Sequence, residues 1–321
     1  MKHLKVLLLA AAIVAASLPA SAQTWPTRPI RAVVPFTAGS TTDIVPRIVF
    51  DQLGVELGQT IIVENRGGAG GTIGAAAVAK SDPDGYTILA NSSAHVISPS
   101  IYPNLPFDTA RDFAAVVPFG ISPNVLVVSP ASGIKTVQAF VAAAKAKPGS
   151  INFSSAGVGT ATHMSAERFR FAAGFEATHV PFRGGPEAMT EVMGGRIDFY
   201  FGPIGTVLSA VQEGKVVALA VNGPIRSSAL PNVPTLQEAG LKDADYPIWY
   251  GVFAPAKTPR EIIDKLHAAT VKALQTPRVV EKLATIGVDP MPMSPKDFDA
   301  LVEKEISVNA SLVKAAGIKP N

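Results

Sequence analysis

The sequence contains no cysteine among its 321 residues. This absence excludes disulfide bonds, thiolate metal sites and cysteine nucleophiles, and it also excludes a lipid carried by an N-terminal cysteine. Histidine is scarce as well. The five histidines show neither an H-x-x-x-H nor an H-E-x-x-H spacing, so we expect no zinc site.

Charged residues are also few, at 17% of the chain, and their signs nearly balance. There are 28 basic and 25 acidic residues, and removing an N-terminal leader that holds two lysines leaves 26 against 25. Such a balance gives no reason to expect nucleic acid or an anionic membrane as a partner. Small and apolar residues dominate instead, which is typical of a compact α/β protein with buried sheets.

The first 22 residues have the pattern of a cleavable signal peptide. Lys2 and Lys5 form a basic start, an apolar run follows from 6 to 16, and Ala20-Ser21-Ala22 is a cleavage site. The apolar run is too short to span a bilayer. We therefore expect a mature chain that begins at Gln23, works outside the cytoplasm and has no lipid anchor. An uncleaved N-terminal helix is the alternative.

Apolar runs that resemble strands alternate with helical patterns along the mature chain. This alternation predicts parallel sheets covered by helices on both faces. A mature chain of about 300 residues exceeds what one core usually holds, so we expect two lobes. The first lobe would hold 23–127 and 250–321, and the second 128–249, with crossovers near 125–130 and 248–253.

A ligand of such a protein lies between the lobes, at the carboxyl ends of the strands. The loops expected there are 36–43, 91–95, 155–160, 182–186 and 201–205. They are rich in glycine and in hydroxyl side chains, and Arg183 is their only obvious cation. Amides and hydroxyls suit a carboxylate, whereas a polyphosphate or a dinucleotide would need more positive charge.

The loop at 36–43 is the clearest part of the expected site, because a buried strand ends before it and a helical pattern follows it. The first amides of a helix have no intrahelical partner and lie at the positive end of its dipole. With the hydroxyls of Ser40, Thr41 and Thr42 they would form a cradle for a carboxylate. We expect Asp43 or Thr42 to cap this helix, which would place Pro46 in its first turn. Contact of Asp43 with a ligand is the alternative.

No catalytic or nucleotide-binding motif is complete. Gly68-Ala69-Gly70 is followed by Ile73, and Gly157-Val158-Gly159 by Thr162, where a dinucleotide-binding turn requires a third glycine. A Gly-Lys-Ser/Thr sequence and a G-x-S-x-G elbow are both missing. We therefore expect a binding protein that is not an enzyme and has no cofactor. An extracytoplasmic enzyme for a small organic acid, or a solute sensor for a membrane kinase, are the alternatives.

Several side chains near the loops have two interpretations that remain open. His95 and His163 either contact a ligand or donate to a structural partner. Asp198 either orients an opposite loop or pairs with a neighbouring backbone group or arginine. Three phenylalanines either wall the ligand site or fill the cores of the lobes: Phe36, Phe182 and Phe201.

The chain contains eight short segments whose order and spacing are specific when they are taken together: 35–43, 64–71, 82–89, 157–163, 179–189, 194–198, 230–240 and 253–259. They include Pro-Phe-Thr-Ala-Gly-Ser-Thr-Thr-Asp at 35–43 and His-Val-Pro-Phe-Arg-Gly-Gly-Pro-Glu-Ala-Met at 179–189. On these segments the chain, over roughly 25–318, resembles the Bug/TctC family. Its members are the extracytoplasmic solute-binding receptors of tripartite tricarboxylate transporters.

The resemblance implies an α/β, two-lobed periplasmic binding protein of a type II-like fold, with two parallel or mixed sheets joined by a double-crossover hinge. It implies closure on a small carboxylate solute and delivery of that solute to the membrane permease subunits of the transporter. We expect a monomer. The chain departs from the family at Ser40, where a second glycine is common, and at Phe182, where tyrosine is common. The identity of the solute is therefore not implied.

The resemblance also implies that loops 36–43 and 155–160 act as pincers on one carboxylate, partly through ordered water. Loops 91–93 and 182–184 would line the remainder. The expected ligand-binding residues are Phe36, Thr37, Ala38, Gly39, Ser40, Thr41, Asp43, Ser92, Ser93, Ser155, Ala156, Gly157, Gly159, Thr160, Arg183, Gly184 and Phe201.

Overall fold

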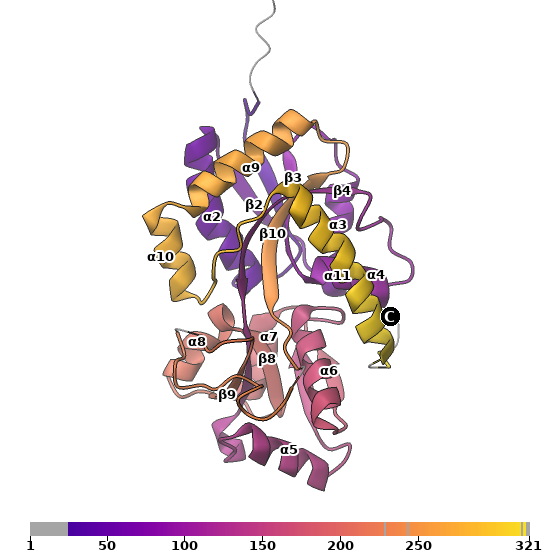
Figure 1. Cartoon of the computed structure of the whole chain (residues 1–321), viewed down its shortest axis with the longest axis vertical. Coiled ribbons are helices and arrows are strands. Elements are labelled where there is room, and N and C mark those ends of the chain that lie inside the picture. The colour runs from indigo at the N-terminus through magenta and orange to yellow at the C-terminus, as the bar shows by residue number, and fades with distance from the viewer. Residues whose placement is uncertain (1–24, 228, 243, 316, 319–321) are drawn as a thin grey trace, which may run out of the picture.

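The structure is a computed structural model that describes residues 25–318 except 228, 243 and 316, so the expected signal peptide lies outside the described residues. Figure 1 shows two lobes stacked along the long axis of the molecule. Each lobe is built on one five-stranded sheet with helices packed against it. Among the described helices, none combines the length and the apolar character needed to cross a membrane.

The sheet of the first lobe has the strand order β2-β1-β3-β10-β4. Its strands are β1 (Ile30–Val34), β2 (Ile61–Asn65), β3 (Thr87–Ser92), β4 (Phe113–Ser122) and β10 (Ile248–Pro255). β1 pairs in parallel with β2 and β3, whereas β10 runs antiparallel to β3 and β4. Every residue of β10 is buried, because the strand is central and both of its faces are covered.

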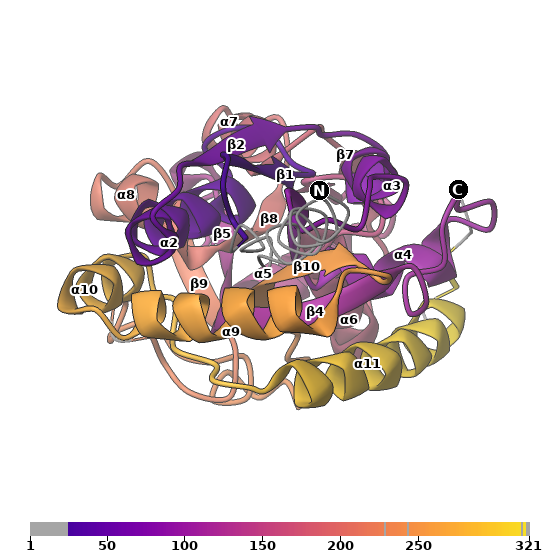
Figure 2. The same cartoon turned by 90° about the horizontal axis from the view of Figure 1, so that it is seen from above.

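Six helices cover this sheet. They are α2 (Thr41–Leu57), α3 (Thr72–Ala79), α4 (Ala94–Ile101), α9 (Arg260–Leu274), α10 (Pro277–Thr285) and α11 (Pro295–Ala315), and a short helix η1 (Ala69–Gly71) precedes α3. Successive side chains of β1 point to opposite faces of the sheet, and they show which helices cover each face. Ala32 packs with α2, α9 and α10, whereas Val33 packs with α3 and α11. Figure 2 shows these two groups on either side of the sheet.

The sheet of the second lobe has the order β7-β6-β8-β5-β9. Its strands are β5 (Asn124–Val128), β6 (Asn152–Ser155), β7 (Thr178–Pro181), β8 (Phe199–Pro203) and β9 (Val217–Asn222). Its helices are α5 (Val137–Ala146), α6 (Ala161–Ala173), α7 (Gly185–Met193) and α8 (Ile204–Gln212), with the short η2 (Pro130–Ser132) after β5. α5 and α6 pack on one face and α7 and α8 on the other.

The chain crosses between the sheets twice, from β4 to β5 at Pro123 and from β9 to β10 through residues 223–247. The expected first boundary, after residue 127, lies inside β5, and all five residues of β5 pair with both β8 and β9. The alternation predicted parallel sheets, but β5 and β10 run antiparallel to their neighbours, so both sheets are mixed, as the implied fold of parallel or mixed sheets allows. Each of these strands follows directly after a crossover.

Candidate ligand-binding site

A cavity lies between the lobes at the carboxyl ends of the strands. All five expected loops contribute to it. Its lining residues are Phe36, Ser40, Thr41, Thr42, Ser92, Ala156, Thr160, Ala161, Thr162, Gly185, Tyr200, Pro203, Thr206 and Ile248. The cavity that they enclose has a volume of about 20 Å³, which is room for about one water molecule, so a solute can enter only when the lobes separate. Because every one of these side chains is neutral at pH 7, the cavity must bind a ligand through dipoles and hydroxyls.

Four helices begin at this cavity. The first two residues of α2, Thr41 and Thr42, line it, as do the first two of α6, Ala161 and Thr162. α7 begins there with Gly185, and α8 begins after Pro203. The first amides of each helix have no intrahelical acceptor and carry the positive end of its dipole. Since α2 belongs to the first lobe and the other three to the second, a carboxylate would meet such amides from both lobes.

The Asp43 carboxylate stabilises the start of α2 from outside the cavity. The N-cap is Ser40, with φ −71° and ψ 157°, so the expected capping by Asp43 or Thr42 is wrong. The buried Asp43 carboxylate instead accepts hydrogen bonds from the Gly39 amide at 2.9 Å, Arg47 Nε at 2.9 Å and Asn65 Nδ2 at 2.8 Å. These three bonds fix the loop before the helix, and Asp43 does not line the cavity.

The hydroxyls before α6 are largely used within their own loop. Thr160 Oγ1 donates to the Gly157 carbonyl at 2.7 Å and caps the helix by accepting from the His163 amide. Ser155 Oγ lies 2.6 Å from His179 Nε2 and 3.0 Å from the Gly157 amide. With these side chains committed, the loop has mainly the free amides at the start of α6 to offer a ligand.

Two buried hydroxyls in the cavity wall, Ser40 Oγ and Tyr200 OH, have no hydrogen-bond partner among the described residues. Burial raises the pKa of the Tyr200 phenol, so it stays protonated and able to donate at neutral pH. A buried hydroxyl without a partner costs free energy that a ligand oxygen would recover. Thr37 Oγ1 and Ser93 Oγ are also buried without a partner, but neither residue lines the cavity.

A second hollow adjoins the cavity, because Phe36 and Ala156 line both. Its other walls are the glycine-rich turn 68–71, Tyr102, and the segments 157–158 and 181–183. Arg183 lies here, on the exposed side, and not in the closed cavity.

The structure thus brings only some of the expected site residues to the cavity. Those that line it are Phe36, Ser40, Thr41, Ser92, Ala156 and Thr160. Gly157 and Arg183 line the second hollow alone. The expected residues that line neither space are Thr37, Ala38, Gly39, Asp43, Ser93, Ser155, Gly159, Gly184 and Phe201. Phe201 lies in the core of the second lobe, 5.4 Å from Phe169 between ring centroids.

None of His95, His163 and Asp198 lines the cavity, and each of them has contacts within the protein. His95 packs in the core with Phe113 and Phe253, and burial lowers its pKa to about 3. His163 Nδ1 accepts from the Gly159 amide at 3.3 Å, and its ring stacks on another histidine. Asp198 accepts from the Asn152 amide at 2.7 Å. Within the described part of the chain, no cluster of three His, Asp or Glu side chains is arranged to hold a metal ion.

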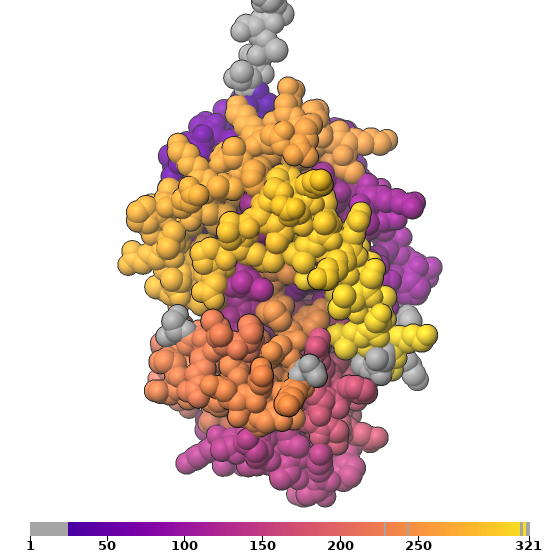
Figure 3. Space-filling model, in the orientation of Figure 1, coloured from indigo at the N-terminus to yellow at the C-terminus, as the bar shows by residue number. Residues whose placement is uncertain are grey.

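The lobes touch each other around the cavity. Thr41 Oγ1 lies 2.8 Å from Thr206 Oγ1, and Tyr102 OH donates to the Val158 carbonyl at 2.8 Å. On the face shown in Figure 3, atoms of the two lobes meet along the waist of the molecule. The cavity is therefore largely enclosed in this form of the protein.

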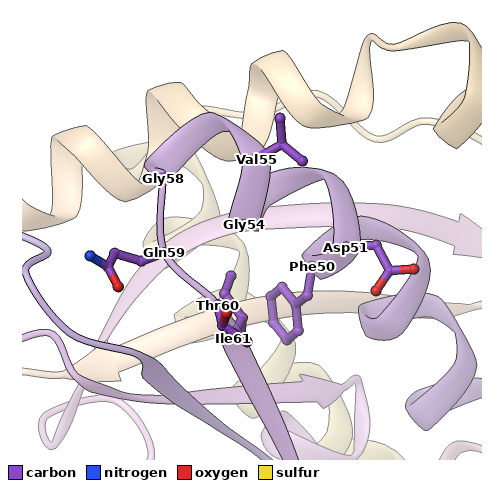
Figure 4. Close-up of a pocket in the computed structure, with 8 residues that line it drawn as sticks. All are labelled: Phe50, Asp51, Gly54, Val55, Gly58, Gln59, Thr60 and Ile61. Atoms are coloured by element: carbon purple, nitrogen blue, oxygen red, sulfur yellow. The ribbon is translucent and has the colours of Figure 1, made fainter.

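A different hollow lies on the outer side of the first lobe, where α2 ends and β2 begins (Figure 4). One continuous stretch of chain, 50–61, supplies all of its lining residues. Figure 4 shows Asp51 and Gln59 pointing to opposite sides. Because no second segment contributes a polar group, this hollow lacks the convergence that a specific small-molecule site requires.

Comparisons with known proteins agree with this geometry. The family described as "Tripartite tricarboxylate transporter family receptor", TctC, matches residues 45–318. Protein BugT of Bordetella pertussis is 35% identical over 303 residues, which cover 94% of this chain and 93% of BugT.

Two solved structures are similar over the whole fold. An R. palustris protein with adipate has a TM-score of 0.89 at 32% identity, covering 92% of this chain and 100% of its own. MatC from Rhodopseudomonas palustris with bound malate has a TM-score of 0.85 at 32% identity, with 90% and 100% covered. The fold and the interlobe cavity define a two-lobed periplasmic binding protein. The chain belongs to the TctC family of solute-binding receptors for tripartite tricarboxylate transporters, which confirms the expected family and fold class.

Proposed function

We propose that this receptor captures a small organic carboxylate between its lobes and delivers it to the permease subunits of a tripartite transporter. The observation that carries the proposal is the meeting of α2 from one lobe with α6, α7 and α8 from the other at one cavity without charged side chains. Unpaired amides at helix starts favour a small anion. Adipate and malate, named with two similar structures, are carboxylates, which supports the same class of solute here.

The mechanism is closure. The solute binds to one lobe of an open form, and the lobes then rotate about the two crossovers, at Pro123 and at 223–247. We propose these crossovers as the lobe boundaries in place of the expected ones. Closure is favoured because the second lobe adds solute contacts that only the closed form makes.

The remaining features of the receptor follow from the same proposal. The protein acts as a monomer in the periplasm after cleavage of its leader, and it returns the solute chemically unchanged. Neutral lining residues and the lack of a complete catalytic motif support binding without turnover.

The proposal is tested by a thermal-shift screen of the chain from Gln23 onward against small carboxylic acids and uncharged sugars. A cognate acid raises the unfolding midpoint, because it binds only the folded protein. Mass spectrometry of the recovered acid should show no change. Midpoint shifts with sugars but with no acid would contradict the proposal, and conversion of a bound acid would identify an enzyme.

A further inference from the structure

We propose that Tyr200 makes the receptor selective for carboxylates that carry a second oxygen acceptor, such as a hydroxyl, a keto group or another carboxylate. This inference deepens the proposed function and rests on it. The first carboxylate would occupy the starts of α2 and α6, and the Tyr200 phenol would donate to the second oxygen.

The position of the Tyr200 ring follows from the alternation of β8. Phe199 and Phe201 pack into the core formed with α5 and α6, so Tyr200, between them, faces α7 and α8. The residue is 0% exposed and lines the cavity.

The phenol oxygen lies close to a residue of the cavity wall. A Cβ built on Gly185 would be 3.0 Å from Tyr200 OH and 3.5 Å from Thr206 Cγ2. Gly185 and Thr206 both line the cavity, and Gly185 is the first residue of α7. The phenol therefore stands beside a helix start, on the wall formed by the second lobe.

The other two buried tyrosines among the described residues both have a hydrogen-bond partner, so the free phenol of Tyr200 is unusual. Tyr246 OH donates to Asn309 Oδ1, and Tyr250 OH lies 3.2 Å from Ser122 Oγ. Tyr200 OH has no such partner among the residues that the structure describes. Burial raises its pKa, so the group that faces the cavity is a neutral donor.

A solute with an oxygen at this point satisfies the phenol, whereas a hydrocarbon at the same point leaves it buried and unpaired. Sites built around a hydrogen bond reject analogues that lack the matching group much more strongly than apolar pockets reject a missing methylene. Tyr200 is thus a specificity-determining residue, while the amides at the helix starts recognise the carboxylate that all candidate solutes share.

The test measures affinities by calorimetry for matched acids: adipate and hexanoate, succinate and butyrate, lactate and propionate. The wild-type protein should prefer the oxygen-bearing member of any pair that it binds. Tyr200→Phe should weaken that member about tenfold or more, as expected for one lost hydrogen bond, and change its partner less than about twofold. Its ligand-free unfolding midpoint should stay at or above that of the wild type, because the lost hydroxyl bonds nothing in the protein.

Tyr246→Phe is the matched control, since it removes a buried phenol that is already paired. It should lower stability without changing the ratio of affinities within a pair. The proposal is overturned if Tyr200→Phe binds both members like the wild type, or weakens both equally. If no acid binds to the wild-type protein, the proposed function itself fails, and that result is distinct from an unchanged ratio.

Discussion

The hydroxyl oxygens of Thr41 and Thr206 lie 2.8 Å apart and join the two lobes at the wall of the cavity. Thr41 is the first residue of α2, and Thr206 lies in the first turn of α8. Because the partners belong to different lobes, opening the cleft must break this bond. The bond therefore couples the position of the start of α2 to closure of the two lobes.

Thr206→Val should weaken solute binding by removing this bond while keeping the shape of the side chain. A hydrogen bond contributes about 1 kcal/mol, so the dissociation constant should rise about fivefold. The loss should appear in the off-rate, measured by stopped-flow fluorescence, because the open form that meets the solute is unchanged. Thr190→Val, which removes an exposed hydroxyl that donates to the Pro186 carbonyl of its own helix, should bind like the wild type. Equal effects of the two substitutions would contradict this role.

Gly184→Ala should prevent full closure. A Cβ built on Gly184 would overlap the hydroxyl of Thr37 in the opposite lobe, whereas its φ of −171° suits any residue, so the open form is not strained. We expect a loss of affinity of at least about tenfold with an unchanged ligand-free unfolding midpoint, and small-angle scattering should show no compaction on adding solute.

Thr37→Ala in the Gly184→Ala background should restore part of the affinity, because it removes the hydroxyl that the new methyl group meets. Wild-type compaction in Gly184→Ala alone would show that the lobes close in some other geometry.

Ser40→Ala should separate binding from stability. The Ser40 hydroxyl is buried without a partner, so its removal should change the free energy of unfolding by less than about 0.5 kcal/mol but weaken the cognate acid about tenfold. Thr160→Val should instead lower the free energy of unfolding by about 1 kcal/mol, because it deletes a helix cap. Urea unfolding and calorimetry measure the two quantities. An unaltered affinity in Ser40→Ala would remove this side chain from the site.

Acid should destabilise the protein through the buried His95 and the partly buried His179. The pKa of His95 and of His179 is lowered to about 3, mainly by burial, whereas in the unfolded chain each binds a proton near pH 6.5. The contribution of each neutral histidine to the free energy of unfolding is complete above that pH. It is lost progressively as the pH falls toward 3, by about 1.4 kcal/mol per pH unit for each histidine. Glu167, with a lowered pKa, adds to the loss below its usual range, and Glu305, with a raised pKa, opposes it.

Urea unfolding of His95→Phe at pH 7 and pH 5 tests this account. The variant should lose about 2 kcal/mol less stability than the wild type over that interval. The phenylalanine ring suits the site, because His95 already packs against Phe113 and Phe253. An identical pH dependence in the two proteins would show that His95 does not titrate on unfolding.

The ends of the strands were predictable from the sequence, and with them the five loops at the cavity. Parallel strands place their carboxyl ends at one edge, so finding the strands was enough to find the site. The start of α2 was not predictable in the same way. Asp43 resembles a cap locally, but its carboxylate is bonded to Asn65, which lies far along the chain. With Ser40 as N-cap, Pro46 falls inside the helix and not in its first turn.

Residues within regular elements escaped prediction for a different reason. Residues 199–201 are three consecutive aromatic residues, so the sequence indicates a buried strand but not which face each side chain takes. Phe201 was expected at the ligand and Tyr200 was overlooked, although the alternation of β8 points Tyr200 to the cavity. Thr206 and Ile248 carry no local signal, because only the packing of the lobes brings them to the site.

The most direct measurement is a crystal structure of the protein with the acid that raises its unfolding midpoint most. The account predicts carboxylate oxygens within hydrogen-bond distance of amides at the start of α2 and at the start of α6, directly or through one water, with no charged side chain in contact. A carboxylate held by Arg183, by a metal ion, or outside the interlobe cavity would contradict it.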